Sequence, residues 1–282
     1  MKKLRITALL IVTAIVLTIL SGCTEVELSY TVLDLATVTD VIGGQRSCEV
    51  PGWSYEKQNP HEDASAPAEA TVEFNGETYT GSYDGSFIWM PNPFVSHCYK
   101  AEMEDGTSVD FRINSLTGEM TYISFYNMTE QGTLTEDAES RKIADTVAKN
   151  YISLKDYKVK VESFYDNTAF AYTYYRAVSG YETTDHIRIF VKNGVVSNCD
   201  VAMAGTFKKV KKLTIDEERA TSAIKAKIQQ IYGHLDTMTG YTIQKTEWVK
   251  APDGQYGRLY RIDVDFREGT SSYGAIVDLL LI

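Results

Sequence analysis

The sequence predicts an α+β fold, in which tandem units of one helix packed on an antiparallel sheet follow an all-β unit. Helical periodicity is confined to two stretches, whereas alternation of apolar and polar residues recurs through much of the remaining chain. Each helical stretch is followed by three strand patterns, and residues 70–132 show hairpin patterns alone. A helix with one apolar stripe and a sheet with one apolar face can bury each other, which predicts small two-layer units.

These patterns divide the chain into five segments. We expect a lipoprotein signal peptide, then a lipidated N-terminus with a strand and a linker, a β-hairpin unit, and two helix-plus-antiparallel-sheet units. In that order they cover residues 1–22, 23–69, 70–132, 133–210 and 211–282.

The N-terminus has the pattern of an export signal. Lys2, Lys3 and Arg5 precede an apolar run from Ile6 to Leu20. A helix needs roughly 20 apolar residues to span a bilayer. The run is shorter than that, so a cleaved signal fits it better than the alternative, an uncleaved membrane helix.

The residues at the end of this run indicate where the protein is located. Leu20-Ser21-Gly22-Cys23 resembles the lipobox of bacterial lipoproteins. The resemblance implies that Cys23 is linked to a diacylglyceryl group and becomes the new N-terminus after cleavage. Two or more acyl chains anchor a protein stably, whereas one chain is marginal. We therefore expect a protein that is lipid-anchored in the cell membrane, at its extracytoplasmic face.

The charge balance restricts the partners. The chain has a net charge of −10, and removal of residues 1–22 takes away three basic residues and no acidic ones. The processed chain then has 25 basic and 38 acidic residues, a net charge of −13. Phosphate binding needs a basic surface, so a nucleic-acid partner is excluded. Anionic headgroups also repel such a surface, so the lipid on Cys23 is expected to hold the protein at the membrane.

Three cysteines remain besides Cys23, an odd number for an exported protein. Cys48 and Cys98 are the candidate disulfide because they lie closest in sequence, and Cys199 would then be a lone thiol. The equal alternative is that all three are small buried apolar side chains. No two of them form a C-x-x-C motif, and no two histidines stand at metal-ligand spacing, so we expect no metal or other cofactor.

Hairpins dominate the first unit. Val72 and Phe74 precede Asn75-Gly76, a pair that suits a type I′ turn because both central residues need positive φ. A second hairpin is predicted around a turn at residues 115–118.

The two helices are predicted to open at Leu134-Thr135 and at Leu213-Thr214. Thr214 with Glu217 fits a capping box, and Gly233 lies where a C-terminal cap belongs. Strand patterns follow the first helix at residues 157–161, 170–174 and 187–196, and the second at residues 241–243, 260–266 and 275–282.

Three of these pieces resemble the PepSY and PepSY-like domains of secreted bacterial proteins. They are Leu134-Thr135 with Ala138, Leu213-Thr214, and the turn from Asn114 to Glu119. The resemblance implies a role in peptidase inhibition or regulation, or another non-enzymatic role at the cell envelope.

Catalytic motifs are missing from the sequence. It contains no G-x-S-x-G, H-E-x-x-H, P-loop or G-x-G-x-x-G. Ser222 and Lys225 match S-x-x-K, but the predicted helix explains both as solvent-facing residues. Asp263 and Asp265 share a strand face with two arginines, which favours a solvated charge ladder over a carboxylate pair.

Aromatic residues are the remaining functional signal. Alternate residues of a strand point to opposite faces, so one aromatic set in the region of residues 164–175 exceeds what a one-sided core needs. Exposed aromatics are typical of binding surfaces, although packing between units or in a dimer explains the same residues. The predicted binding residues are Tyr172, Tyr174, Tyr175 and Trp89.

The preferred function is therefore a non-catalytic lipoprotein that presents a protein- or peptide-binding surface. A small-molecule or carbohydrate-binding lipoprotein using the same aromatics is one alternative. A hydrolase of unrecognised type is another, for which only the acidic residues can be offered.

Overall fold

The computed structural model describes residues 28–282, except residues 39–41, 90, 91, 93, 129–135, 166 and 252. The lipobox with Cys23 and the predicted helix start at Leu134-Thr135 lie outside the described residues. Within them, no helix combines the length and the apolar character that crossing a membrane requires.

In the described part of the chain, thirteen strands are joined in one sheet. The strand order is β1-β13-β12-β11-β9-β10-β6-β5-β4-β3-β2, and β8 with β7 branches from β9. The bounds are β1 Val32–Asp34, β2 Glu69–Phe74, β3 Glu77–Ile88, β4 Val95–Glu102, β5 Ser108–Asn114, β6 Met120–Tyr126, β7 Lys158–Phe164, β8 Ala169–Val178, β9 Tyr181–Lys192, β10 Val195–Asp200, β11 Met238–Lys250, β12 Tyr256–Glu268 and β13 Ser271–Leu281.

The predicted fold class, tandem helix-on-sheet units after an all-β unit, was wrong. Strands make up 48% of the structure and helices 14%, and the strands form a large mixed sheet. Strand β10 pairs with β6 of the expected first unit, at Cys199 with Ile123. Strand β9 pairs in parallel with β11, at Thr183 with Trp248. Periodicity identifies the buried face of a strand but not the edge at which it pairs, so the joining of the units could not be seen.

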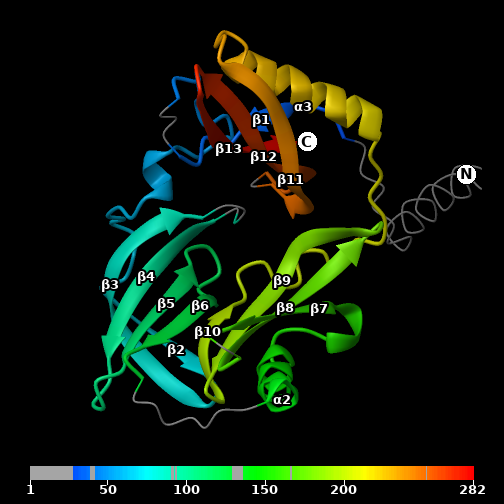
Figure 1. Cartoon of the computed structure of the whole chain (residues 1–282). Helices are drawn as coiled ribbons and strands as arrows, with labels where there is room; N and C mark the ends of the chain where they lie inside the picture. Colours follow the sequence, from blue (N-terminus) through cyan, green and yellow to red (C-terminus); the bar gives the residue numbers. More distant parts are fainter. Residues whose placement is uncertain are drawn as a thin grey trace, which may run out of the picture.

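Two α-helices occur in the described residues, α2 (Asp137–Ala148) and α3 (Glu217–Tyr232). Helix α3 lies over β11–β13, and α2 lies against β8 and β9 (Figure 1). Ala144 and Val147 of α2 pack on Tyr172 and Ile189 in one core. A second core joins α3 to β12 and β13 through Ala220, Ile224, Ile228, Ile231, Ile262, Val264, Phe266, Val277 and Leu279.

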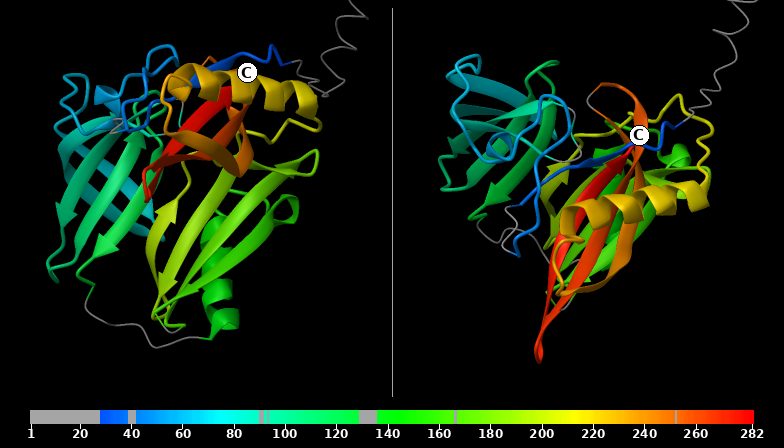
Figure 2. Two further views of the ribbon diagram at one scale, coloured as in Figure 1. Left: turned by 45° about the horizontal axis from the view of Figure 1, so that its top comes forward. Right: turned by 90° about the horizontal axis from the view of Figure 1, so that it is seen from above.

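The N-terminal segment, the described residues from Leu28 to His61, contacts both β13 and β3. Strand β1 pairs with β13, and His61 bridges to Ser86 on β3. In Figure 2 this segment, coloured blue, runs between the strands of the first unit and β13. A short 3₁₀ helix, η1 (Glu56–Gln58), lies within it.

Local turn chemistry was predictable. Asn75 and Gly76 join β2 to β3 with φ of 53° and 86°, as a type I′ turn requires. Asn193 and Gly194 join β9 to β10 with φ of 51° and 78°.

The start of α3 differs from the prediction. The N-cap is Asp216, whose carboxylate accepts hydrogen bonds from the backbone N–H groups of Glu218 (3.1 Å) and Arg219 (3.0 Å). A capping box at Thr214 and Glu217 was therefore wrong, because Asp216 offers a stronger acceptor two residues further on. Gly233 is the C-cap, as predicted.

A buried carboxylate ties the chain after β10 to the sheet. Asp185 has no exposed surface and accepts hydrogen bonds from the hydroxyl of Tyr157 (2.5 Å) and from the backbone N–H groups of Gly205 (2.7 Å) and Phe207 (2.9 Å). The guanidinium of Arg176 lies 3.3 Å away. Burial, with the neighbouring carboxylate, raises the pKa of Tyr157, so its hydroxyl stays a donor to Asp185.

Replacing this carboxylate should destabilise the fold. Asp185→Asn puts an amide N–H₂ where backbone donors converge and leaves Arg176 without its buried partner. We expect the free energy of unfolding to fall by about 3–5 kcal/mol. Urea unfolding followed by tryptophan fluorescence measures the change.

The matched control is Asp156→Asn. Asp156 is the other carboxylate near Arg176, at 3.9 Å, but its side chain is 42% exposed. An exposed pair of this kind contributes about 0–1 kcal/mol, so this variant should unfold close to the unmodified protein. Equal losses of stability in both variants would show that Asp185 is not the buried anchor described.

Candidate functional site

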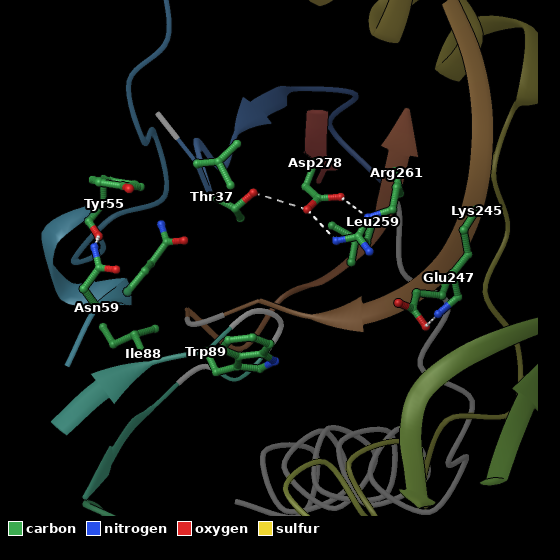
Figure 3. Close-up of a pocket in the computed structure, with 12 residues that line it drawn as sticks. Thr37, Tyr55, Asn59, Ile88, Trp89, Lys245, Glu247, Leu259, Arg261 and Asp278 are labelled. Atoms are coloured by element: carbon green, nitrogen blue, oxygen red, sulfur yellow. Dashed lines mark hydrogen bonds and ion pairs between the residues drawn. The ribbon is translucent and has the colours of Figure 1, made fainter. Parts of the chain in front are cut away.

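A cleft of about 590 Å³ opens where three distant parts of the chain meet. We call it the Trp89 cleft. Its walls are the N-terminal segment, the end of β3, and the face of β11–β13 that points away from α3 (Figure 3). The residues that line it are Thr37, Val38, Tyr55, Gln58, Asn59, Ile88, Trp89, Lys245, Glu247, Leu259, Arg261 and Asp278.

Strand alternation explains why this face of the sheet is polar. Ile262 and Val264 of β12 point to α3, so Leu259 and Arg261 point to the other side. The cleft is therefore built on the face that the core of α3 does not use.

A small apolar cluster forms the base of the cleft. Leu35 and Val50 of the N-terminal segment pack with Ile88 of β3, Val249 of β11 and Leu280 of β13. All five side chains are buried, so the three walls of the cleft are joined by one apolar cluster. That cluster fixes the N-terminal segment against the sheet.

Two ion pairs also hold this segment in place. The guanidinium of Arg46 lies 2.8 Å from the carboxylate of Asp34, and both side chains are almost fully buried. The carboxylate of Glu49 accepts a hydrogen bond from the backbone N–H of Asp34 at 2.7 Å. Its other oxygen lies 2.6 Å from Nζ of Lys227 on α3.

The polar wall is a row of side chains in register across three strands. Lys245 of β11 is opposite Arg261 of β12, which is opposite Asp278 of β13. Arg261 donates from Nε and Nη2 to the two oxygens of Asp278, both at 2.9 Å. Lys245 donates to Glu247 at 2.9 Å, and Thr37 donates to Asp278 at 3.4 Å. The hydrogen bonds to Asp278 raise the pKa of Arg261, which keeps its positive charge.

Trp89 is the one predicted binding residue that lies in the cleft. It follows β3 directly and is 59% exposed. Its ring meets Phe87 edge-on, with centroids 6.1 Å apart. A large apolar ring with this exposure, beside the buried Ile88, is a feature of binding surfaces rather than of cores.

The three predicted tyrosines, Tyr172, Tyr174 and Tyr175, do not line this cleft. Tyr172 and Tyr174 have no exposed surface and face α2. Tyr172 donates to the carboxylate of Asp137 at 2.8 Å, and Tyr174 donates to that of Asp145 at 2.6 Å. They are core residues with satisfied hydroxyls. Tyr175 is half-buried, on the opposite face of β8.

Cys48 and Cys98 are free thiols, so the candidate disulfide between them is not formed in the structure. Cys48 borders the apolar base of the cleft, whereas Cys98 lies within β4. Burial raises the pKa of Cys98 to about 11 and also raises that of Cys48. The buried Cys199 packs in the core of α2.

The carboxylates considered for hydrolysis, Asp263 and Asp265, lie on one face of β12. Asp263 accepts a hydrogen bond from the amide of Gln244 at 2.6 Å, and this contact is exposed. Asp265 is exposed beside it on the sheet face. Across the described ranges, no group of three or more His, Cys, Asp and Glu side chains could hold a metal ion.

Sequence reasoning missed most of the cleft. It placed Arg261 in a charge ladder but could not see that Asp278 and Lys245 flank it. Thr37 and Asp278, which share a hydrogen bond, are 241 residues apart. The alternation in β12 shows that Arg261 faces away from the core, and that was the only available signal.

Comparisons with known proteins give no family. No family model matches the chain, and no curated protein matches it. Among solved structures, the chain is similar to the C-terminal domain of YpeB from Bacillus megaterium, with a TM-score of 0.37 and 8% sequence identity over 74% of this chain and 82% of that one. A likeness of this size does not assign a function.

The raised pKa of Cys98 predicts slow alkylation. With a pKa of about 11, roughly a thousandth of Cys98 is thiolate at pH 8, against about a quarter for an unhindered thiol. The rate of reaction with iodoacetamide should therefore rise about tenfold per pH unit between pH 7.5 and 9.5 in the native protein. Peptide mapping separates Cys98 from the other cysteines. The protein unfolded in urea is the control, and equal rates at pH 8 in both states would contradict the burial of this thiol.

Proposed function

We propose that this chain is a non-catalytic lipoprotein, anchored through Cys23 at the extracytoplasmic face of the cell membrane, that binds a polypeptide segment in the Trp89 cleft. The exposed indole of Trp89 carries the proposal. Aromatic anchors that sit in a pocket with polar neighbours dominate protein–protein binding energies. The cleft supplies such a pocket between an apolar base and a row of charged side chains.

The edge of β11 favours an extended peptide as the ligand. Pairing between β11 and β9 is limited to Trp248 with Thr183. On that side, residues 238–247 pair with no other strand among those that the structure describes. Lys245 and Glu247 of this stretch line the cleft. An extended peptide can add to such an edge by backbone hydrogen bonds while its side chains enter the adjoining pocket.

A role for this binding follows from the PepSY-like pieces. The resemblance of Leu213-Thr214 and of the turn from Asn114 to Glu119 supports the regulation of an extracytoplasmic peptidase. The bound segment would then belong to that peptidase or to one of its substrates.

A small molecule or carbohydrate is the second candidate ligand, and the size of the cleft favours it. Pockets for such ligands have volumes of about 300–1,000 Å³, which includes the cleft. Tyr55 and Trp89 supply two aromatic rings in its lining. This alternative predicts thermal stabilisation by a small ligand and no captured polypeptide.

Truncation of Trp89 should abolish capture of the partner. A photo-crosslinking amino acid at Val38, which is 53% exposed and lines the cleft, should trap a polypeptide in cells. Trp89→Ala removes the anchor, and loss of an anchor residue costs about 2 kcal/mol or more, a fall in affinity of about 30-fold. Mass spectrometry of the crosslinked product measures the loss.

Two controls make this experiment decisive. Tyr126→Ala removes an exposed ring, 46% accessible, that does not line the cleft, and should leave capture unchanged. The crosslinker placed at Leu116, which is 80% exposed and also outside the cleft lining, should trap nothing specific. If Trp89→Ala and Tyr126→Ala are captured alike, the site is misplaced.

The lipid anchor has its own test. Cys23→Ala removes the thiol that the lipobox resemblance assigns to the diacylglyceryl group. We expect metabolic labelling with an alkyne fatty acid to fall to background in this variant. Cys48→Ala keeps the lipobox and should stay labelled. Persistent labelling of Cys23→Ala would contradict the lipid anchor at Cys23 and would not affect the proposed peptide binding in the cleft.

A further inference from the structure

We infer that the Trp89 cleft selects peptides that bring a carboxylate, either a C-terminus or an Asp or Glu side chain, next to an apolar residue. This inference rests on the proposed function and names the ligand class of the same site. It is carried by the way in which the charged row is oriented.

In both ion pairs of the row, the anion is much less exposed than the cation. The side chain of Asp278 is 7% exposed and its partner Arg261 is 56% exposed. The side chain of Glu247 is 12% exposed and its partner Lys245 is 55% exposed. A ligand in the cleft therefore meets two cationic groups first, although the chain as a whole has a net charge of −10.

Arg261 is already oriented for a bidentate contact. Asp278 occupies Nε and one position of Nη2, and none of the described hydrogen bonds involves Nη1. Arginine has five N–H donors, so the outer edge of the guanidinium keeps donors for a second carboxylate. Two parallel N–H···O bonds to a carboxylate are among the strong hydrogen bonds in proteins. Because Asp278 fixes the side chain, binding costs little of its rotational freedom.

The charge count favours a carboxylate over a phosphate. The row holds two cations and two anions, so it is neutral before a ligand arrives. A single negative charge can be accepted by the exposed cations, whereas a dianion would meet Asp278 and Glu247 without a surplus of positive charge to balance it.

The apolar half of the ligand has a separate contact. In Figure 3, Lys245 and Arg261 lie at the end of the cleft away from Tyr55 and Asn59, and Trp89 lies between the two ends. The charged row can therefore hold the carboxylate while the neighbouring side chain packs on the indole.

The test uses the full-length lipidated protein in detergent and three pools of pentapeptides of random apolar sequence, each with an uncharged N-terminal dye. The first pool ends in a free carboxylate, the second in an amide, and the third in an amide with one internal Asp. Fluorescence anisotropy measures the affinity of each pool. We expect the first or the third pool to bind at least about tenfold more tightly than the second, and the better pool identifies the source of the carboxylate.

Variants test whether the charged row causes the preference for a carboxylate. Arg261→Gln should bring the carboxylate pool down to the affinity of the amide pool without abolishing binding. Arg267→Gln is the matched control, since Arg267 is exposed on the same face of β12 and does not line the cleft. Arg261→Gln leaves Asp278 unpaired, so the double variant Arg261→Gln with Asp278→Asn is measured beside it, with thermal melting of both as the check on folding.

Each outcome decides something. If all three pools bind equally and Trp89→Ala weakens their binding, the selection for a carboxylate is overturned and the peptide-binding site is retained. Binding of no pool would overturn both. Displacement of the carboxylate pool by inorganic phosphate at lower concentration than by acetate would assign the row to phosphate and overturn the inference.

Discussion

The Trp89 cleft depends on the ion pair between Asp34 and Arg46. Among the described residues between 28 and 58, the segment that carries Asp34 has one strand of three residues and no α-helix, so regular hydrogen bonding holds little of it. The pair is almost fully buried, and Glu49 extends it to Lys227 on α3. A buried pair gives modest net stability, but leaving one partner unpaired is costly, so positions of the segment that separate the two charges are disfavoured. The wall formed by Thr37 and Val38 follows from the position in which the two charges meet.

Several carboxylates of this acidic chain are buried together with the groups that neutralise them. Asp185, Asp34 and Asp278 are all buried, and each is met by an arginine or by backbone N–H groups. Burial of a carboxylate is tolerated only with such partners. In the pair of Asp278 and Arg261, the aspartate is the buried member and the arginine is the exposed one. The exposed cations of the cleft therefore belong to ion pairs with less exposed carboxylates, and they do not require an excess of basic residues in the chain.

How much of this was visible in the sequence can be judged from particular residues. Asn75-Gly76 and Gly233 had the predicted local roles, because turn and cap chemistry acts over a few residues. Tyr172 and Tyr174 were assigned to a surface, since alternation shows that they share a face but not which face α2 covers. Trp89 was named as a binding residue because exposed aromatic residues are typical of binding surfaces. Arg261, Lys245 and Asp278 were missed as a group because strand register joins them, and register between β11, β12 and β13 is set by pairing over the whole sheet.

The charges also determine how a ligand would reach the cleft. At physiological salt the Debye length is about 8 Å, so an approaching carboxylate feels the net charge of the chain, −10, as a weak, screened repulsion. The neutral row adds no long-range attraction to offset it. Attraction begins only when the carboxylate is close to Arg261 and Lys245, where the exposed cations are nearer than the less exposed anions. Selectivity of this kind acts through slow dissociation rather than fast association. It requires a guanidinium that is already in place, and the two hydrogen bonds from Arg261 to Asp278 provide that.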